Sequence, residues 1–164
     1  MFVTIPLLII FIIVLMYFIH HDKLQFIEEK LVIIEEKINS TLIKRKEILK
    51  DSESEIKELV KTDKNIFSDL NSLDSKSMDM FELDKKLMVY KKEFSLIVDK
   101  YDVLKTNNEF QKLSFAISET SDKLETYRKY YNNYAEKYNK IIKSFPTIIA
   151  TIIKRRKNKD FFDI

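Results

Sequence analysis

The sequence contains no glycine and no cysteine, and its only prolines are Pro6 and Pro146. The lack of glycine excludes the glycine-rich loops that cradle phosphate groups. The lack of cysteine excludes disulfides, thiolate metal ligands and a cysteine nucleophile. Residues 7–145, between the two prolines, lack both of the strongest helix breakers. We therefore expect an all-α protein.

Groups suited to metal binding and catalysis are also scarce. The two histidines, His20 and His21, are adjacent, so they point to different faces of a helix and lack the one-turn spacing of a metal site. No glutamate stands three residues before a histidine, as it does in the di-metal helical bundles. We expect no enzyme activity, no metal and no cofactor, and we interpret the histidines as an interfacial pair beside a membrane.

Charge of one sign does not dominate the chain. The 29 lysines and arginines nearly balance the 26 aspartates and glutamates, and the formal net charge is +3. Such a balance is not typical of a dedicated nucleic-acid-binding protein, so we expect no nucleic-acid partner. The partner classes that remain are the lipid bilayer, another protein and a second copy of the chain.

A long apolar run begins the chain. Residues 2–19 contain no charge, and at about 1.5 Å of rise per residue they form roughly 27 Å of helix, close to the thickness of the hydrocarbon core of a bilayer. No basic segment precedes the run and no small-residue cleavage site ends it, so we expect a retained anchor rather than a signal peptide. Lys23, Lys30 and Lys37 follow the run and no cation precedes it, which predicts an N-terminus outside the cell membrane and a cytoplasmic bundle.

Beyond the anchor, apolar residues recur with alternating spacings of three and four, which is the pattern of amphipathic helices. The pattern predicts four helices, the first continuous with the anchor: residues up to 49, 52–70, 80–104 and 110–145. Ser52 and Glu55 have capping-box spacing at the first break, residues 71–77 have the composition of a turn, and residues 106–109 form another polar break. Short polar connections between long helices predict an antiparallel four-helix bundle.

A cation interrupts the apolar seam of the first helix. The seam formed by Leu24, Leu31 and Ile38 reaches Arg45 after another seven residues. A cation at a core position must be paired or must reach the surface, because an unpaired buried charge is costly. We favour a structural ion pair with Glu119 on the fourth helix, and the alternative is that Arg45 binds a carboxylate or phosphate of a ligand.

A row of tyrosines follows one face of the fourth helix. Its members are Tyr127, Tyr131, Tyr134 and Tyr138. Aromatic residues at helical spacing are usually part of a core, so we expect packing rather than an aromatic ligand slot. Asn132 and Asn139, seven residues apart, flank this row, and we expect them to form hydrogen bonds across helices rather than to bind a ligand.

The fourth helix also resembles the signature of the LemA family, which is an arginine followed by Tyr-Asn, a second Tyr-Asn seven residues later, and then Phe-Pro. The corresponding residues here are Arg128, Tyr131, Asn132, Tyr138, Asn139, Phe145 and Pro146. The late pair Phe161-Phe162 followed by Asp163 is similar to the usual ending of the family. Some positions depart from the family pattern: Ser121 stands where glutamate is frequent, and Lys50 and Asp102 stand where proline is found.

This resemblance implies a helical bundle carried by one N-terminal transmembrane helix, with a short N-terminus outside and no established molecular function. Some relatives are encoded beside membrane metalloproteases, which implies a membrane protease as one partner. The candidate structural or partner contacts are Arg45, Glu119, Arg128, Tyr131, Asn132, Tyr138 and Asn139.

The predicted organisation is a transmembrane anchor at 1–21, a helical bundle at 22–146 and a C-terminal tail at 147–164. Antiparallel packing returns this tail to the bilayer. There the apolar run 148–153 can lie in the membrane interface, and the basic residues after it suit an anionic lipid surface. The candidate lipid contacts are Lys154, Arg155, Arg156, Lys157, Phe161 and Phe162. A solvated, frayed tail is the alternative, and we weigh the two equally.

These observations favour a non-enzymatic, membrane-anchored scaffold or adaptor that acts through protein contacts. Long helices offer grooves to an amphipathic partner helix. The alternative is a protein that binds or organises anionic lipids through its basic C-terminal segment.

Overall fold

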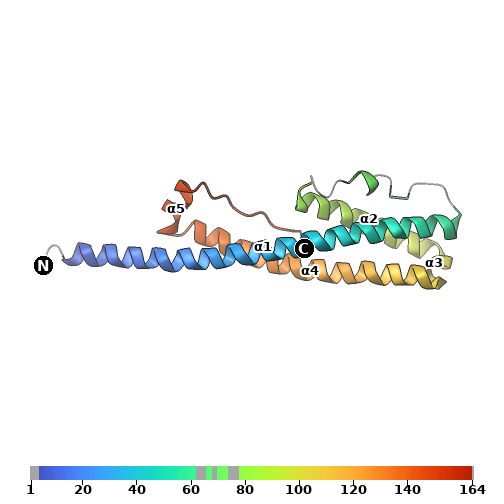
Figure 1. The fold of residues 1–164 in the computed structure, drawn as a ribbon, viewed down its shortest axis with the longest axis horizontal. Coiled ribbons are helices and arrows are strands. Elements are labelled where there is room, and N and C mark those ends of the chain that lie inside the picture. Colours follow the sequence, from blue (N-terminus) through green and yellow to red (C-terminus); the bar gives the residue numbers. More distant parts are fainter. Residues whose placement is uncertain (1–3, 62–65, 68–69, 74–77, 164) are drawn as a thin grey trace. The chain divides into compact units, whose positions relative to one another are not determined.

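The structure, a computed structural model, describes residues 4–61, 66–67, 70–73 and 78–163 (Figure 1). These residues form helices and one 3-10 turn, with no strand, and the predicted all-α class is confirmed. The elements are α1 (Thr4–Val60), η1 (Leu70–Ser72), α2 (Met80–Lys100), α3 (Asp102–Thr106), α4 (Asn108–Ile142) and α5 (Thr147–Ile153). Residues 1–3 of the predicted anchor lie outside the described residues.

The first helix is longer than predicted, because α1 continues without a break through the expected boundary at 50–52. Ser52 is buried inside this helix, and its hydroxyl donates a hydrogen bond to the Ile48 carbonyl oxygen at 2.7 Å. A serine bonded to the residue four positions earlier continues a helix instead of capping a new one. The predicted start of a second helix at Ser52 is therefore wrong. The helix α1 instead ends at Val60, and the next residue, Lys61, has a φ of 54°.

Between α1 and α2, the described residues 66–67 and 70–73 include the 3-10 turn η1 and no α-helix. The Ile66 amide donates to the Glu53 carboxylate at 3.1 Å, and Phe67 and Leu70 are buried before and within η1. The turn predicted at 71–77 extends into residues 74–77, which lie outside the described part of the chain.

The chain divides into two compact units, and α1 and α4 each contribute residues to both. One unit comprises Met1–Glu36 and Arg128–Ile164, and the other comprises Lys37–Tyr127. In the second unit, apolar positions of α1, α2 and α4 form the core predicted from their three-four spacing. Its buried members include Ile38, Leu42, Leu49, Ile56, Leu83, Leu87, Phe94, Phe110, Ile117 and Leu124. The rings of Phe94 and Phe110 stack with their centroids 5.5 Å apart.

The predicted third helix is interrupted once. Tyr101 adopts an extended backbone between α2 and α3, with φ of −121° and ψ of 104°. Asp102, at the position where the family has proline, is the first residue of α3. A helix therefore begins at this position without the proline. The break predicted at 106–109 is narrower than expected, because Thr106 ends α3 and Asn108 begins α4, which leaves Asn107 alone between them. The Asn107 side chain accepts a hydrogen bond from the Phe110 amide at 2.9 Å at the start of α4.

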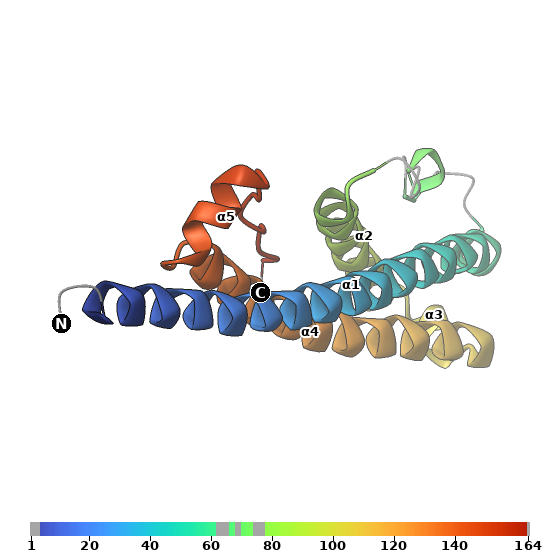
Figure 2. The same cartoon turned by 60° about the vertical axis from the view of Figure 1, so that its left-hand side comes forward.

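In the first unit, α1 and α4 run side by side in opposite directions (Figures 1 and 2). Their shared core contains Leu24, Ile27, Leu31, Ile34, Tyr131, Ala135, Tyr138 and Ile142. The predicted fourth helix ends three residues early, at Ile142, and α5 begins after Pro146. No residue of α1 from Thr4 to Ile19 is buried against the rest of the protein. Among the described residues, α1 is the one helix long and apolar enough to cross a membrane.

Candidate functional site

Two asparagines of α4 hold the C-terminal segment. The Asn139 amide donates to the Lys159 carbonyl at 2.9 Å and accepts from the Lys159 amide at 2.8 Å. Asn132 repeats the arrangement, donating to the Phe162 carbonyl at 2.8 Å and accepting from the Phe162 amide at 2.9 Å. Each side chain thus pairs with the backbone of one residue, as a neighbouring strand would. We call this arrangement the asparagine clasp.

The seven-residue spacing of the clasp matches the spacing of the segment that it holds. Seven residues of helix between Asn132 and Asn139 rise about 10.5 Å. The three extended residue steps from Lys159 to Phe162 cover about 10 Å. Asn132 and Asn139 form structural hydrogen bonds, as predicted. Their partners are backbone groups of the C-terminal segment, so the prediction that they bond to another helix is wrong.

Side chains of α1 hold the other edge of the C-terminal segment. Arg156 lies 3.4 Å from a Glu28 carboxylate oxygen, and the Lys159 ammonium lies 2.9 Å from Glu35. These glutamates are seven residues apart, like the two asparagines, so α1 and α4 offer matched contacts. Sequence reasoning missed Glu28 and Glu35, although their spacing is the signal that could have found them.

Phe162 completes the attachment. It is 5 % exposed, and its ring meets the edge of the Tyr131 ring with centroids 5.1 Å apart. Phe162 is therefore unavailable to lipid, and its prediction as a lipid contact is wrong because the clasp turns it into the core. A frayed tail is likewise wrong at Lys159 and Phe162, because the clasp holds the backbone of both residues. Phe161 is exposed, as are Lys154, Arg155 and Lys157, whereas Arg156 is partly covered by its contact with Glu28.

Arg45 lies in the core of the other unit and is 1 % exposed. Its Nε donates to the Thr120 hydroxyl at 3.3 Å and its Nη2 donates to the Ser121 hydroxyl at 2.9 Å. Glu119 instead binds Lys123 at 2.7 Å, and this hydrogen bond lowers the pKa of Glu119. The predicted pair of Arg45 with Glu119 is therefore wrong. Burial places Arg45 beyond the reach of a ligand, and its contacts favour a packing role.

The other signature residues of α4 are also buried. Tyr131, Tyr138 and Arg128 are each less than a tenth exposed. Burial raises the pKa of the Tyr138 phenol, and the negative charge of Glu28 raises it further. The interpretation of the tyrosine row as core is supported for Tyr131 and Tyr138, so the signature builds the α1–α4 core and the clasp rather than an open ligand slot.

The histidine at the end of the apolar run contacts the connection between α4 and α5. His20 Nδ1 lies 3.2 Å from the Thr147 hydroxyl and 3.5 Å from the Ser144 hydroxyl. These contacts attach the turn after α4 to α1 at His20, which directly follows the apolar run. Within the described residues, no three His, Cys, Asp or Glu side chains lie close enough together to hold a metal ion.

A groove of about 430 Å³ lies between α1 and α4 in the unit that contains the clasp. Its lining residues are Lys23, Phe26, Ile27, Tyr134, Lys137, Lys140 and Ile141. The surface is mainly apolar, and Phe26 is 52 % exposed. Lys137 lies 5.2 Å from the centre of the Tyr134 ring, and Lys140 pairs with Glu136 at 2.6 Å. The groove therefore combines an apolar floor with a cationic rim.

Comparison with known families matches residues 35–164 to the LemA family. No curated protein and no solved structure matches the chain significantly. The matched range includes the asparagine clasp, the segment that it holds and both buried arginines, Arg45 and Arg128. The chain belongs to the LemA family.

Proposed function

We propose that this protein is a non-enzymatic scaffold or adaptor, anchored in the cell membrane by the first part of α1 and acting through protein contacts. The exposed apolar surface from Thr4 to Ile19 supports the anchor, because such a surface is costly in water and favourable in lipid. The lysines that follow it support an N-terminus outside and the remaining helices in the cytoplasm.

The observation that carries the proposal is the groove between α1 and α4. An exposed aromatic residue in a groove between two helices is typical of a surface that receives the apolar face of a partner helix. Lys23, Lys137 and Lys140 on the rim favour acidic side chains in that partner. The partner class is therefore an amphipathic helix with acidic flanks, belonging to a membrane protein such as a protease or to a second copy of the chain.

Site-specific crosslinking in native membranes tests this role. A photo-crosslinker placed at Phe26 is expected to capture one discrete partner in stoichiometric yield, and the substitutions Lys137→Glu and Lys140→Glu should abolish the capture. Phe115, an exposed aromatic residue of the other unit, is the matched control position and should not capture that partner. Capture of the chain itself would identify a self-assembling scaffold. Equal yields from both positions would contradict a role for the groove.

A second candidate function is the binding of anionic lipid by the basic segment after α5. Its support is that Lys154, Arg155 and Lys157 are exposed, whereas Arg156 contacts Glu28. Because the chain has no cysteine, a dye on Asn158→Cys reports this segment alone. Its emission should differ between vesicles with and without anionic lipid, and neutralising the three exposed cations should remove the difference. Unchanged emission in the two lipids would remove this candidate.

A further inference from the structure

The short helix α5 begins at the level where the apolar run of α1 ends. His20 directly follows Ile19 and contacts Thr147, the first residue of α5. Figures 1 and 2 both draw α5 turning away from the α1–α4 pair, across the direction of α1. If α1 spans a membrane, a helix that leaves its direction at this level lies near the membrane surface.

One face of α5 is apolar and uncovered. Ile148, Ile149 and Ile152 are 39 %, 55 % and 72 % exposed. At 100° per residue these three positions fall within one 100° sector of the helix. Thr147 lies outside that sector and is buried. The exposed sector is the kind of surface that amphipathic interfacial helices insert into the boundary between headgroups and acyl chains.

Both ends of α5 are held, so the apolar face has a defined position. Thr147 is held by His20, and the chain after α5 turns back through Arg155, whose φ is 49°. In this turn the Arg156 amide donates to the Thr151 carbonyl at 3.1 Å, and the Arg155 amide donates to the Ile152 carbonyl at 3.3 Å, the two bonds of a Schellman motif. The asparagine clasp then fixes the chain from Lys159 onward.

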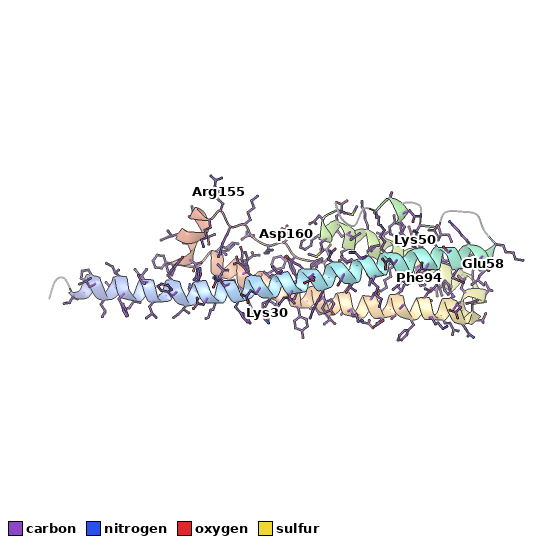
Figure 3. All side chains as sticks on the ribbon, viewed as in Figure 1. Lys30, Lys50, Glu58, Phe94, Arg155 and Asp160 are labelled. Carbon is purple, nitrogen blue, oxygen red and sulfur yellow. The ribbon has the colours of Figure 1, made fainter. Side chains whose placement is uncertain are left out.

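Cations follow the apolar face directly. Lys154 and Arg155 are exposed at the end of α5, and Figure 3 shows Arg155 pointing away from the helices. Neither side chain has an acidic partner among the contacts of the described residues, so both can meet lipid phosphates.

We propose that α5 is an interfacial foot, which lies in the same leaflet from which α1 emerges and binds phospholipid with its three exposed isoleucines. Lys154 and Arg155 bind anionic headgroups beside it. This inference rests on the proposed anchoring of α1 in the membrane. The foot gives the chain a second attachment beside the transmembrane helix, which restrains the tilt and rotation of α1 in the bilayer.

Tryptophan fluorescence of the full chain in proteoliposomes tests the foot, because the natural sequence has no tryptophan. Three single substitutions are compared in vesicles of phosphatidylcholine and phosphatidylglycerol with brominated acyl chains. Ile152→Trp reports the foot and Ile12→Trp reports the anchor. Val32→Trp is the control, an exposed apolar position of α1 that lies about 18 Å beyond His20.

Bromine near the carbonyl end of the acyl chains should quench the indole at position 152 several-fold more than the indole at position 32. Replacing Ile148 and Ile149 with serine should reduce that quenching while leaving the Ile12→Trp signal unchanged. Quenching at position 12 without quenching at position 152 would overturn the foot and leave the anchor intact. Position 12 lies near the middle of the apolar run, so bromine near the methyl end of the acyl chains reports it, and no quenching by that bromine would overturn the anchor itself. A blue-shifted indole at position 152 that bromine does not quench would show a protein surface over α5, which also overturns the foot.

Discussion

At the residue scale, the chemistry of the asparagine amide explains the Tyr-Asn repeat of α4. An amide carries both a donor and an acceptor, so a single side chain can bond the N–H and the C=O of one backbone residue. Aspartate lacks the donor and glutamine is longer by one methylene group. The same helix offers a matched comparison in Asn133, which is exposed beside Asn132.

Replacing Asn132 or Asn139 with alanine should release the segment that each holds. Each substitution removes two hydrogen bonds worth about 1 kcal/mol apiece, so exchange of the Lys159 and Phe162 amide hydrogens should accelerate by about tenfold or more. Hydrogen exchange read by mass spectrometry of the C-terminal peptide measures this effect. Asn133→Ala is the control and should leave exchange unchanged. Full protection in Asn132→Ala and Asn139→Ala would contradict the clasp.

Arg45 should contribute to stability rather than to ligand binding. Arg45→Ala truncates a large side chain that is 1 % exposed, so we expect a loss of about 3 kcal/mol in the free energy of unfolding. Urea unfolding in detergent micelles, followed by circular dichroism, measures it. Lys44→Ala, at the exposed neighbouring position, should change the free energy by less than about 0.5 kcal/mol. Equal stability of the two variants would contradict a packing role for Arg45.

The buried phenol of Tyr138 should make stability depend on pH in the alkaline range. Because the folded state holds the phenol proton more tightly than the unfolded state, the contribution is complete below the ordinary pKa of 10.0 and is lost as the pH rises above it. Between about pH 9 and about pH 11, the natural chain should therefore lose more stability than Tyr138→Phe, which has no proton to release. Denaturant unfolding across this range measures the difference, and identical slopes for the two chains would contradict the raised pKa.

At the element scale, the absence of glycine affects how helices end. Lys61 after α1 and Arg155 after α5 both adopt the left-handed backbone that glycine usually supplies at such positions. A non-glycine residue there costs about 1 kcal/mol, so tertiary contacts must stabilise each turn. Near Lys61 the contact is Ile66 with Glu53, and near Arg155 it is Arg156 with Glu28.

The continuity of α1 leads to a prediction at position 50. Proline inside a helix removes one hydrogen bond and clashes with the preceding turn, so Lys50→Pro should lower the free energy of unfolding by about 3 kcal/mol relative to Lys50→Ala. The comparison is informative because Lys50 is exposed and its side chain is not part of the core. Urea unfolding of the two variants measures the difference. If both are equally stable, a helix boundary at 50–52 is correct and the continuous α1 is not.

At the scale of the whole molecule, the anchor and the lysines after it predict which side of the membrane the folded helices occupy. A cysteine introduced as Lys137→Cys, at an exposed position, should not react with an impermeant maleimide in intact cells and should react after permeabilisation. The absence of natural cysteines makes the labelling specific. Reaction in intact cells would reverse the proposed orientation. The groove would then lie outside the cell and α5 would lie in the outer leaflet.

Local patterns predicted much of this fold, because helix formation and burial of one face depend on nearby residues. The three-four spacing placed Leu24, Leu31, Leu87 and Leu124 in the core, where they are buried. It could not decide between a capping box and a continuous helix at Ser52, since one hydroxyl can serve either arrangement. The choice depends on what the following residues contact, and Glu53 is occupied by Lys57 and by the Ile66 amide.

Local features of the chain were enough to predict the all-α class, the apolar run at the start of α1, the core faces of the helices and the resemblance to the LemA family. Each of these follows from composition, periodicity or a short motif. Only the folded chain shows that the asparagines bind the C-terminal segment, that Phe162 is buried and that Arg45 contacts Thr120 rather than Glu119. The physical reason is distance along the chain. Those contacts join residues 20 to 75 positions apart, and no local spacing specifies which backbone an amide or a guanidinium will meet.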